Sequence, residues 1–84
     1  MLAELVAEGE KLGEQVEWDA RRFVHVLEGV EFEKWTAEVI LYLERHHPDS
    51  SLTAKAIDQT RGKVGYDEYQ FLLGLMKALQ ETGD

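Results

Sequence analysis

The sequence has no cysteine, a single proline and no long apolar run. Without cysteine, neither a disulfide framework nor a thiolate metal site can form, and small secreted domains commonly depend on one of them. We therefore expect a cytoplasmic location. No apolar stretch approaches the roughly 20 residues that a helix needs to span a bilayer, and residues 1–4 lack the basic lead of a signal peptide. The sequence thus predicts no membrane span, and its 84 residues predict one domain over 1–84.

Basic residues are also scarce. Nine Lys and Arg residues stand against 17 Asp and Glu residues, which gives a formal net charge of -8. Eleven of the acidic residues lie within residues 1–47, beside five basic ones. Nucleic-acid affinity comes largely from Lys and Arg side chains that displace counterions from phosphates. The charge balance therefore disfavours direct binding of DNA or RNA.

The first third of the chain carries apolar and small residues in steps of three and four. This ladder consists of Leu5, Gly9, Leu12, Val16, Ala20, Phe23, Leu27 and Val30. Its spacing follows the period of an α-helix and predicts one long helix from Leu2 to Glu28, capped by Gly29. Gly9 lies on the apolar stripe and indicates close packing, whereas Gly13 lies off the stripe and indicates a bend. We expect one bent helix in preference to two separate ones.

A second helix is predicted from Phe32 to His47. It ends there because Pro48 disfavours helical geometry at the residue before it and has no N–H to donate. The stretch from Val39 to Leu43 is apolar almost all round, which is typical of a helix that is buried on more than one side. We therefore expect this helix to occupy the centre of the fold.

Two more helices complete the prediction. A short one runs from Leu52 to Thr60, after the N-capping residues 49–51 (Asp-Ser-Ser). The last one begins at Tyr66 or Asp67 and ends at Glu81. No alternation typical of a strand is visible. The predicted fold class is therefore all-α: a small bundle of four helices with a long bent first helix, a central second, a short third and an amphipathic fourth.

The second and fourth predicted helices are apolar on two faces. Whatever the bundle leaves uncovered would form a patch for a second copy or a partner protein; the alternative is that the monomer covers these residues itself. Trp18 lies on the flank of the first predicted helix near Arg22, with the composition of an interface hot spot, or it is covered by the last helix. The candidate interface residues are Trp18, Leu41, Tyr42, Phe71 and Leu75.

Few residues are arranged for chemistry. Glu44 and His47 share a helical face at i, i+3 spacing, as in carboxylate-bridged metal bundles, but such sites need a second Glu-x-x-His pair. Residues 62–65 (Gly-Lys-Val-Gly) lack the ending that grips nucleotide phosphates. No serine or threonine stands in a recognisable nucleophile motif. We therefore expect no enzyme activity, no catalytic residue, no metal site and no cofactor.

Several short segments resemble a small helical module that occurs in bacterial proteins, alone or ahead of effector domains of predicted phage-defence proteins. They are Glu8-Gly9-Glu10-Lys11-Leu12, Phe32-Glu33-Lys34-Trp35, Leu43 with Ser50-Ser51, and Gly74-Leu75-Met76-Lys77-Ala78-Leu79. The likeness extends over about the whole chain and consists mostly of packing and turn residues. It implies a bacterial or mobile-element setting and a non-catalytic interaction role, and it carries over no catalytic residue.

The leading functional hypothesis is a non-catalytic protein–protein interaction module. We expect it to self-associate as a homodimer or to bind a partner protein. Two alternatives stay open. The acidic first half would suit a regulator or decoy that occupies a basic nucleic-acid-binding surface of a partner. The size and helix count would also suit a toxin-immunity-type helical bundle, by analogy alone. The sequence identifies no small-molecule substrate.

Overall fold

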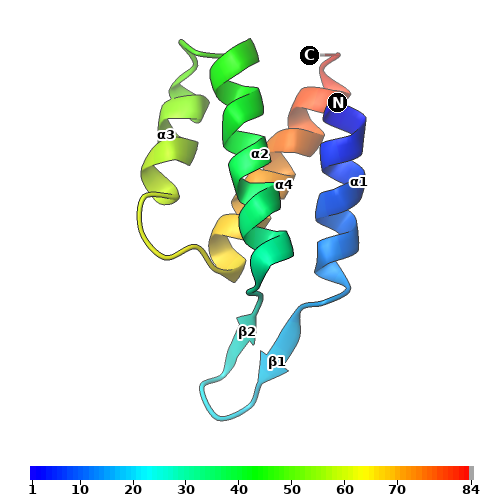
Figure 1. Ribbon diagram of the computed structural model, residues 1–84, viewed down its shortest axis with the longest axis vertical. Coiled ribbons are helices and arrows are strands. Elements are labelled where there is room, and N and C mark those ends of the chain that lie inside the picture. Colours follow the sequence, from blue (N-terminus) through cyan, green and yellow to red (C-terminus); the bar gives the residue numbers. More distant parts are fainter. Residues whose placement is uncertain (84) are drawn as a thin grey trace.

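Four helices and one short β-hairpin form the fold in the computed structural model, which describes residues 1–83 (Figure 1). In chain order the elements are α1 (Leu2–Gly13), β1 (Glu17–Asp19), β2 (Val24–Val26), α2 (Val30–His46), α3 (Ser51–Gln59) and α4 (Tyr66–Glu81). Helix α2 contacts all three other helices, and α1 also packs against α4. The predicted helical bundle with a central second helix is therefore confirmed, with a hairpin in addition.

One hydrophobic core lies between the helices. Its largest fully buried side chains are Trp35, Phe32, Leu43, Leu72, Met76 and Val39. All six come from α2 and α4. Helix α1 adds Leu5, Val6 and Leu12 from its inner face, and α3 adds Ala56. Burial of these apolar side chains is the main source of stability in a chain of this size.

The predicted first helix is wrong beyond residue 13. Helix α1 ends at Gly13, and residues 17–26 form an antiparallel hairpin in which Trp18 pairs with His25. Of the ladder, Leu5, Gly9 and Leu12 are buried on α1 and Leu27 is buried after β2, whereas Phe23 and Val30 are exposed. After Gly13, the β-branched valines at 16, 24 and 26 and an aromatic residue favour extended backbone. This preference for extended backbone outweighs the helical spacing of the ladder beyond Gly13.

Asp19 organises the turn between the two strands. Its Oδ1 atom accepts hydrogen bonds from the backbone N–H groups of Arg21 at 3.0 Å and Arg22 at 3.3 Å, and its Oδ2 atom accepts one from Arg22 Nε at 2.8 Å. An aspartate that bonds the backbone just ahead of it is a recurrent turn former. The turn then passes through Phe23, whose φ of 55° lies in the left-handed region. This conformation is rare for a bulky residue.

Contacts between aromatic rings join the hairpin to the bundle. The centroid of His25 lies 5.0 Å from that of Trp18 and 4.7 Å from that of Tyr66. Tyr66 in turn lies 6.1 Å from Tyr69 on the buried face of α4. The hairpin projects from the end of the bundle opposite the two termini (Figure 1). The aromatic contacts at its base therefore anchor it to the bundle.

Helix α1 is held by two hydrogen bonds to its own backbone carbonyls. Trp35 Nε1 donates to Leu5 O at 2.8 Å, and the Tyr69 hydroxyl donates to Gly9 O at 2.6 Å; both bonds are buried. A Cβ atom on Gly9 would lie 2.7 Å from the Trp35 ring and 2.8 Å from Leu73. The close packing that the sequence predicts at Gly9 is thus confirmed.

The remaining helix ends follow local rules. Ser50 caps α3, since its Oγ accepts from the Leu52 N–H at 3.2 Å, as predicted. The Glu68 side chain accepts from the Gly65 N–H at 2.8 Å ahead of α4. Gly29, expected to end the first helix, instead precedes α2 with a φ of 118°.

Two glycine-to-alanine substitutions should have opposite effects on stability. Gly9→Ala should lower the free energy of unfolding by about 1–3 kcal/mol, because the new methyl group overlaps a buried ring that cannot move without losing its hydrogen bond. Gly74→Ala should raise it by about 0.5–1 kcal/mol, because alanine favours the helix and no atom lies within 4 Å of the added Cβ. Urea unfolding followed by circular dichroism measures both; equal effects would contradict the close packing at Gly9.

The turn should be sensitive to acid. The side-chain hydrogen bond from Arg22 lowers the pKa of Asp19 below its ordinary value. A lowered pKa means that the ionised carboxylate stabilises the hairpin above the ordinary carboxyl range, and that this contribution is lost as the pH falls below about 4. In NMR spectra, the amide signals of Arg21 and Arg22 should move toward unstructured positions on acidification.

Asp19→Ala should produce the same spectral change at neutral pH. Asp58→Ala is the control, because the Asp58 carboxylate lies 3.7 Å from Arg61 in a largely exposed pair outside the hairpin. This substitution should leave the hairpin signals in place. If neither acid nor Asp19→Ala changes the hairpin signals, the carboxylate does not hold the turn.

Candidate functional site

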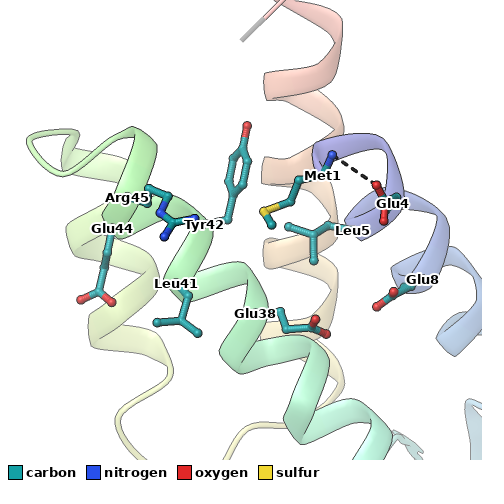
Figure 2. A pocket seen from close by; sticks show the side chains of 9 residues that line it. All are labelled: Met1, Glu4, Leu5, Glu8, Glu38, Leu41, Tyr42, Glu44 and Arg45. Atoms are coloured by element: carbon teal, nitrogen blue, oxygen red, sulfur yellow. Dashed lines mark ion pairs between the residues drawn. The ribbon is translucent and has the colours of Figure 1, made fainter.

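A groove opens between the N-terminal half of α1 and the C-terminal half of α2 (Figure 2). Its volume is about 610 Å³, within the range of small-ligand and peptide-anchor pockets. We call it the α1/α2 groove. It is lined by Met1, Glu4, Leu5, Glu8, Glu38, Leu41, Tyr42, Glu44 and Arg45.

Helical spacing brings these side chains to one surface. Steps of three and four residues, as from Glu4 to Glu8 in α1 and from Glu38 to Leu41 in α2, repeat along one face of a helix. Leu5 and Tyr42 are buried at the bottom of the groove. Leu41 also lines the groove and is 64% exposed. The groove therefore combines a filled base with an uncovered apolar side chain.

Four glutamate side chains line the same groove as Leu41. Glu4 and Glu8 stand on α1, while Glu38 and Glu44 stand three residues before and after Leu41 on α2 (Figure 2). The positive groups are Arg45 and the N-terminal amine; the amine lies 3.4 Å from Glu4 Oε1.

Glu44 adds to this negative potential, because it lies in the last turn of α2, where the helix dipole is also negative. The groove thus has an acidic rim with too few cations of its own to balance it.

The predicted interface residues do not form one patch. Leu41 and Tyr42 both line the α1/α2 groove, but Tyr42 is only 6% exposed. Leu75 is 7% exposed and belongs to the core. Phe71 is partly buried under Lys55, whose Nζ lies 5.1 Å from the ring centroid. Trp18 stands apart on β1 and is 54% exposed.

The monomer itself therefore covers Tyr42 and Leu75, which corrects their expected place on an apolar patch. Both side chains belong to the hydrophobic core, and Tyr42 borders the groove with only a small part of its surface. Leu41 and Trp18 keep large exposed surfaces. These two side chains remain as candidates that a partner could contact.

The structure adds a second exposed surface at the hairpin. We call residues 20–23 (Ala-Arg-Arg-Phe) the hairpin tip. Phe23 is 78% exposed, and its ring lies 6.3 Å from that of Trp18 in an edge-to-face arrangement. Arg21 and Arg22 precede it in the turn. The sequence argument missed this surface because it placed Phe23 on a helical stripe; the signal was Asp19, a turn-forming residue, between two β-branched segments.

Chemical groups elsewhere have structural roles. Burial raises the pKa of Tyr69, whose hydroxyl bonds Gly9 O inside the core. Within residues 1–83, no three His, Asp or Glu side chains are grouped so that they could hold a metal ion. In the same part of the chain, no helix combines the length and apolar character that a bilayer span requires.

Comparisons with known proteins return no relative: no family model matches the sequence, and neither the curated proteins nor the solved structures contain a match. The functional argument therefore rests on the geometry and charge of this chain.

Truncation should affect stability little at Leu41 and strongly at Leu75. Leu41→Ser should change the free energy of unfolding by less than about 0.5 kcal/mol, because the side chain already contacts water. Leu75→Ala should lower it by about 2–5 kcal/mol through lost burial and an unfilled cavity. Thermal and urea unfolding of both variants measure the difference. A large loss for Leu41→Ser would mean that the groove surface is part of the core and unavailable to a partner.

Proposed function

We propose that the protein is a non-catalytic protein-interaction module whose α1/α2 groove binds a basic segment carrying an apolar anchor. The observation that supports this function is the exposed Leu41 side chain in a groove that Glu4, Glu8, Glu38 and Glu44 also line. The apolar surface provides burial, and the carboxylates select a partner of positive charge.

Electrostatics favours a cationic partner over a neutral one. Like charges on the same rim repel each other, and the Arg45 guanidinium and the N-terminal amine only partly offset them. A Lys or Arg side chain brought to the rim relieves this repulsion and gains new attraction. An acidic partner, including a nucleic-acid backbone, would meet an unfavourable potential.

The apolar contact supplies affinity that charge alone does not. Exposed ion pairs contribute little, typically below about 1 kcal/mol each, whereas burial of a large apolar side chain contributes about 1.5–3 kcal/mol. The proposed partner segment therefore carries a Leu, Met or aromatic side chain between its cations. A bacterial or mobile-element setting and a cytoplasmic location, which the resemblance and the lack of cysteine favour, are part of the same proposal.

A labelled amphipathic peptide made of leucine and lysine tests the groove directly. Fluorescence anisotropy should show binding that weakens as salt rises, while the same peptide with glutamate in place of lysine should not bind. Leu41→Asp should weaken the interaction at least about tenfold, because it removes the apolar contact that the peptide buries.

Charge reversal inside and outside the groove shows whether the peptide is attracted by the groove carboxylates or by the whole acidic surface. Glu8→Lys with Glu38→Lys should abolish measurable binding. Glu17→Lys with Glu28→Lys makes the same change in net charge at exposed sites outside the groove and should leave binding nearly intact. Equal losses for the two double variants would favour a decoy that uses its whole acidic surface, and absence of peptide binding would refute the proposal.

A further inference from the structure

We infer that the basic segment which fits the α1/α2 groove is the hairpin tip of a second copy of this chain, so that copies associate head to tail. The inference rests on the proposed function of the groove and names its occupant. It comes from the chemistry of the two surfaces: one is apolar with an acidic rim, and the other presents an aromatic ring beside two arginines.

The hairpin tip has the composition that the groove requires. Arg21 and Arg22 are exposed, in a chain with nine basic residues in all. Arg22 uses its Nε on Asp19, which holds the side chain at the turn, and a guanidinium has further N–H groups for a second carboxylate. Phe23 follows as an aromatic anchor with most of its surface in water.

Backbone strain at Phe23 points the same way. Its φ of 55° places a bulky residue in a conformation that Asn or Gly adopts at lower cost. The edge-to-face contact with the half-exposed Trp18 ring leaves 78% of the Phe23 side chain exposed, so little burial offsets this conformation. Strain of this kind is typical of positions kept for binding. At the tip, the exposed ring directly follows the two arginines in the sequence.

Complementary charges match across the two surfaces. The tip brings Arg21 and Arg22, with Asp19 at its base. The groove offers Glu4, Glu8, Glu38 and Glu44 against Arg45 and the N-terminal amine. In the complex the ring of Phe23 lies on Leu41, and the guanidinium groups pair with the glutamates on the rim. Arg–carboxylate pairs next to a buried aromatic anchor are typical of interface hot spots.

The position of the two surfaces excludes self-occupancy. The groove lies at the end of the molecule that holds both termini, and the hairpin projects from the opposite end of its 40 Å long axis (Figure 1). A tip therefore reaches only the groove of another copy. Such a contact joins two different surfaces, so each added copy leaves one free tip and one free groove, and the assembly grows or closes into a ring.

Sedimentation velocity over a range from micromolar to millimolar protein tests the inference. The mass-average size should rise with concentration beyond that of a dimer. Phe23→Asn should weaken association about ten- to a hundredfold while keeping or improving the turn, since asparagine tolerates left-handed backbone. Arg21→Glu should also weaken it, and Leu41→Asp should abolish it.

Leu52→Asp is the matched control, because Leu52 is an exposed leucine on α3 outside both surfaces. Its association should equal that of the wild type. Hairpin NMR signals in Phe23→Asn establish that the turn remains folded.

A mixing experiment distinguishes head-to-tail contact from a symmetric dimer. Phe23→Asn retains an intact groove, and Leu41→Asp retains an intact tip. At a concentration where the wild type associates and each variant alone is monomeric, their mixture should form a heterodimer that grows no further. A tip-to-tip or groove-to-groove interface would let one of the two variants associate alone and would not be restored by mixing, so a monomeric mixture overturns the inference.

Failure of this inference is separable from failure of the proposed function. A wild-type chain that stays monomeric at millimolar concentration, yet binds the leucine–lysine peptide in its groove, would overturn the head-to-tail contact and leave the proposed function standing. A chain that neither associates nor binds the peptide would overturn both.

Discussion

The position of α1 depends on two aromatic side chains that donate hydrogen bonds to its backbone. Trp35 and Tyr69 reach the carbonyl oxygens of Leu5 and Gly9 from two different helices. A buried indole or phenol without a partner is costly, and the missing side chain of Gly9 is what allows the rings to approach. These bonds fix how deeply α1 sits and how far it is shifted along its axis. The seam with α2, the α1/α2 groove and the start of the hairpin all follow from that placement.

The charge of the protein is distributed unevenly, and the net value of -8 hides this. One end presents glutamates around an exposed leucine, and the other presents two arginines beside an exposed phenylalanine. Overall repulsion would keep copies apart at long range, while the local arrangement offers attraction in one orientation only. Specificity in such a case comes from the pattern of charge, because misaligned contacts bring like charges together.

Three of the four helices could be predicted from the sequence nearly to the residue, because their signals are local: Pro48 ends α2, Ser50 caps α3 and acidic residues begin α4. The hairpin could not, because the spacing of Val16, Ala20 and Phe23 fits a helix, and only the competing preference of valines and the Asp19 turn decides against it. The apolar pattern around the second helix predicts Leu41 as a candidate, and the aromatic residue beside an arginine predicts Trp18. The groove around Leu41 could not be, because it requires knowledge of which faces of α1 and α2 meet.

The two tryptophans report on different parts of the molecule through their fluorescence. Trp35 lies in the core with its indole N–H bonded to a backbone carbonyl, so its emission should be blue-shifted and protected from dissolved quenchers such as acrylamide. Trp18 lies at the hairpin end with half of its surface in water and an imidazole ring 5.0 Å away. Light emitted by the quencher-sensitive fraction therefore comes from the hairpin. Burial of that region can be followed through intrinsic fluorescence, without any attached dye.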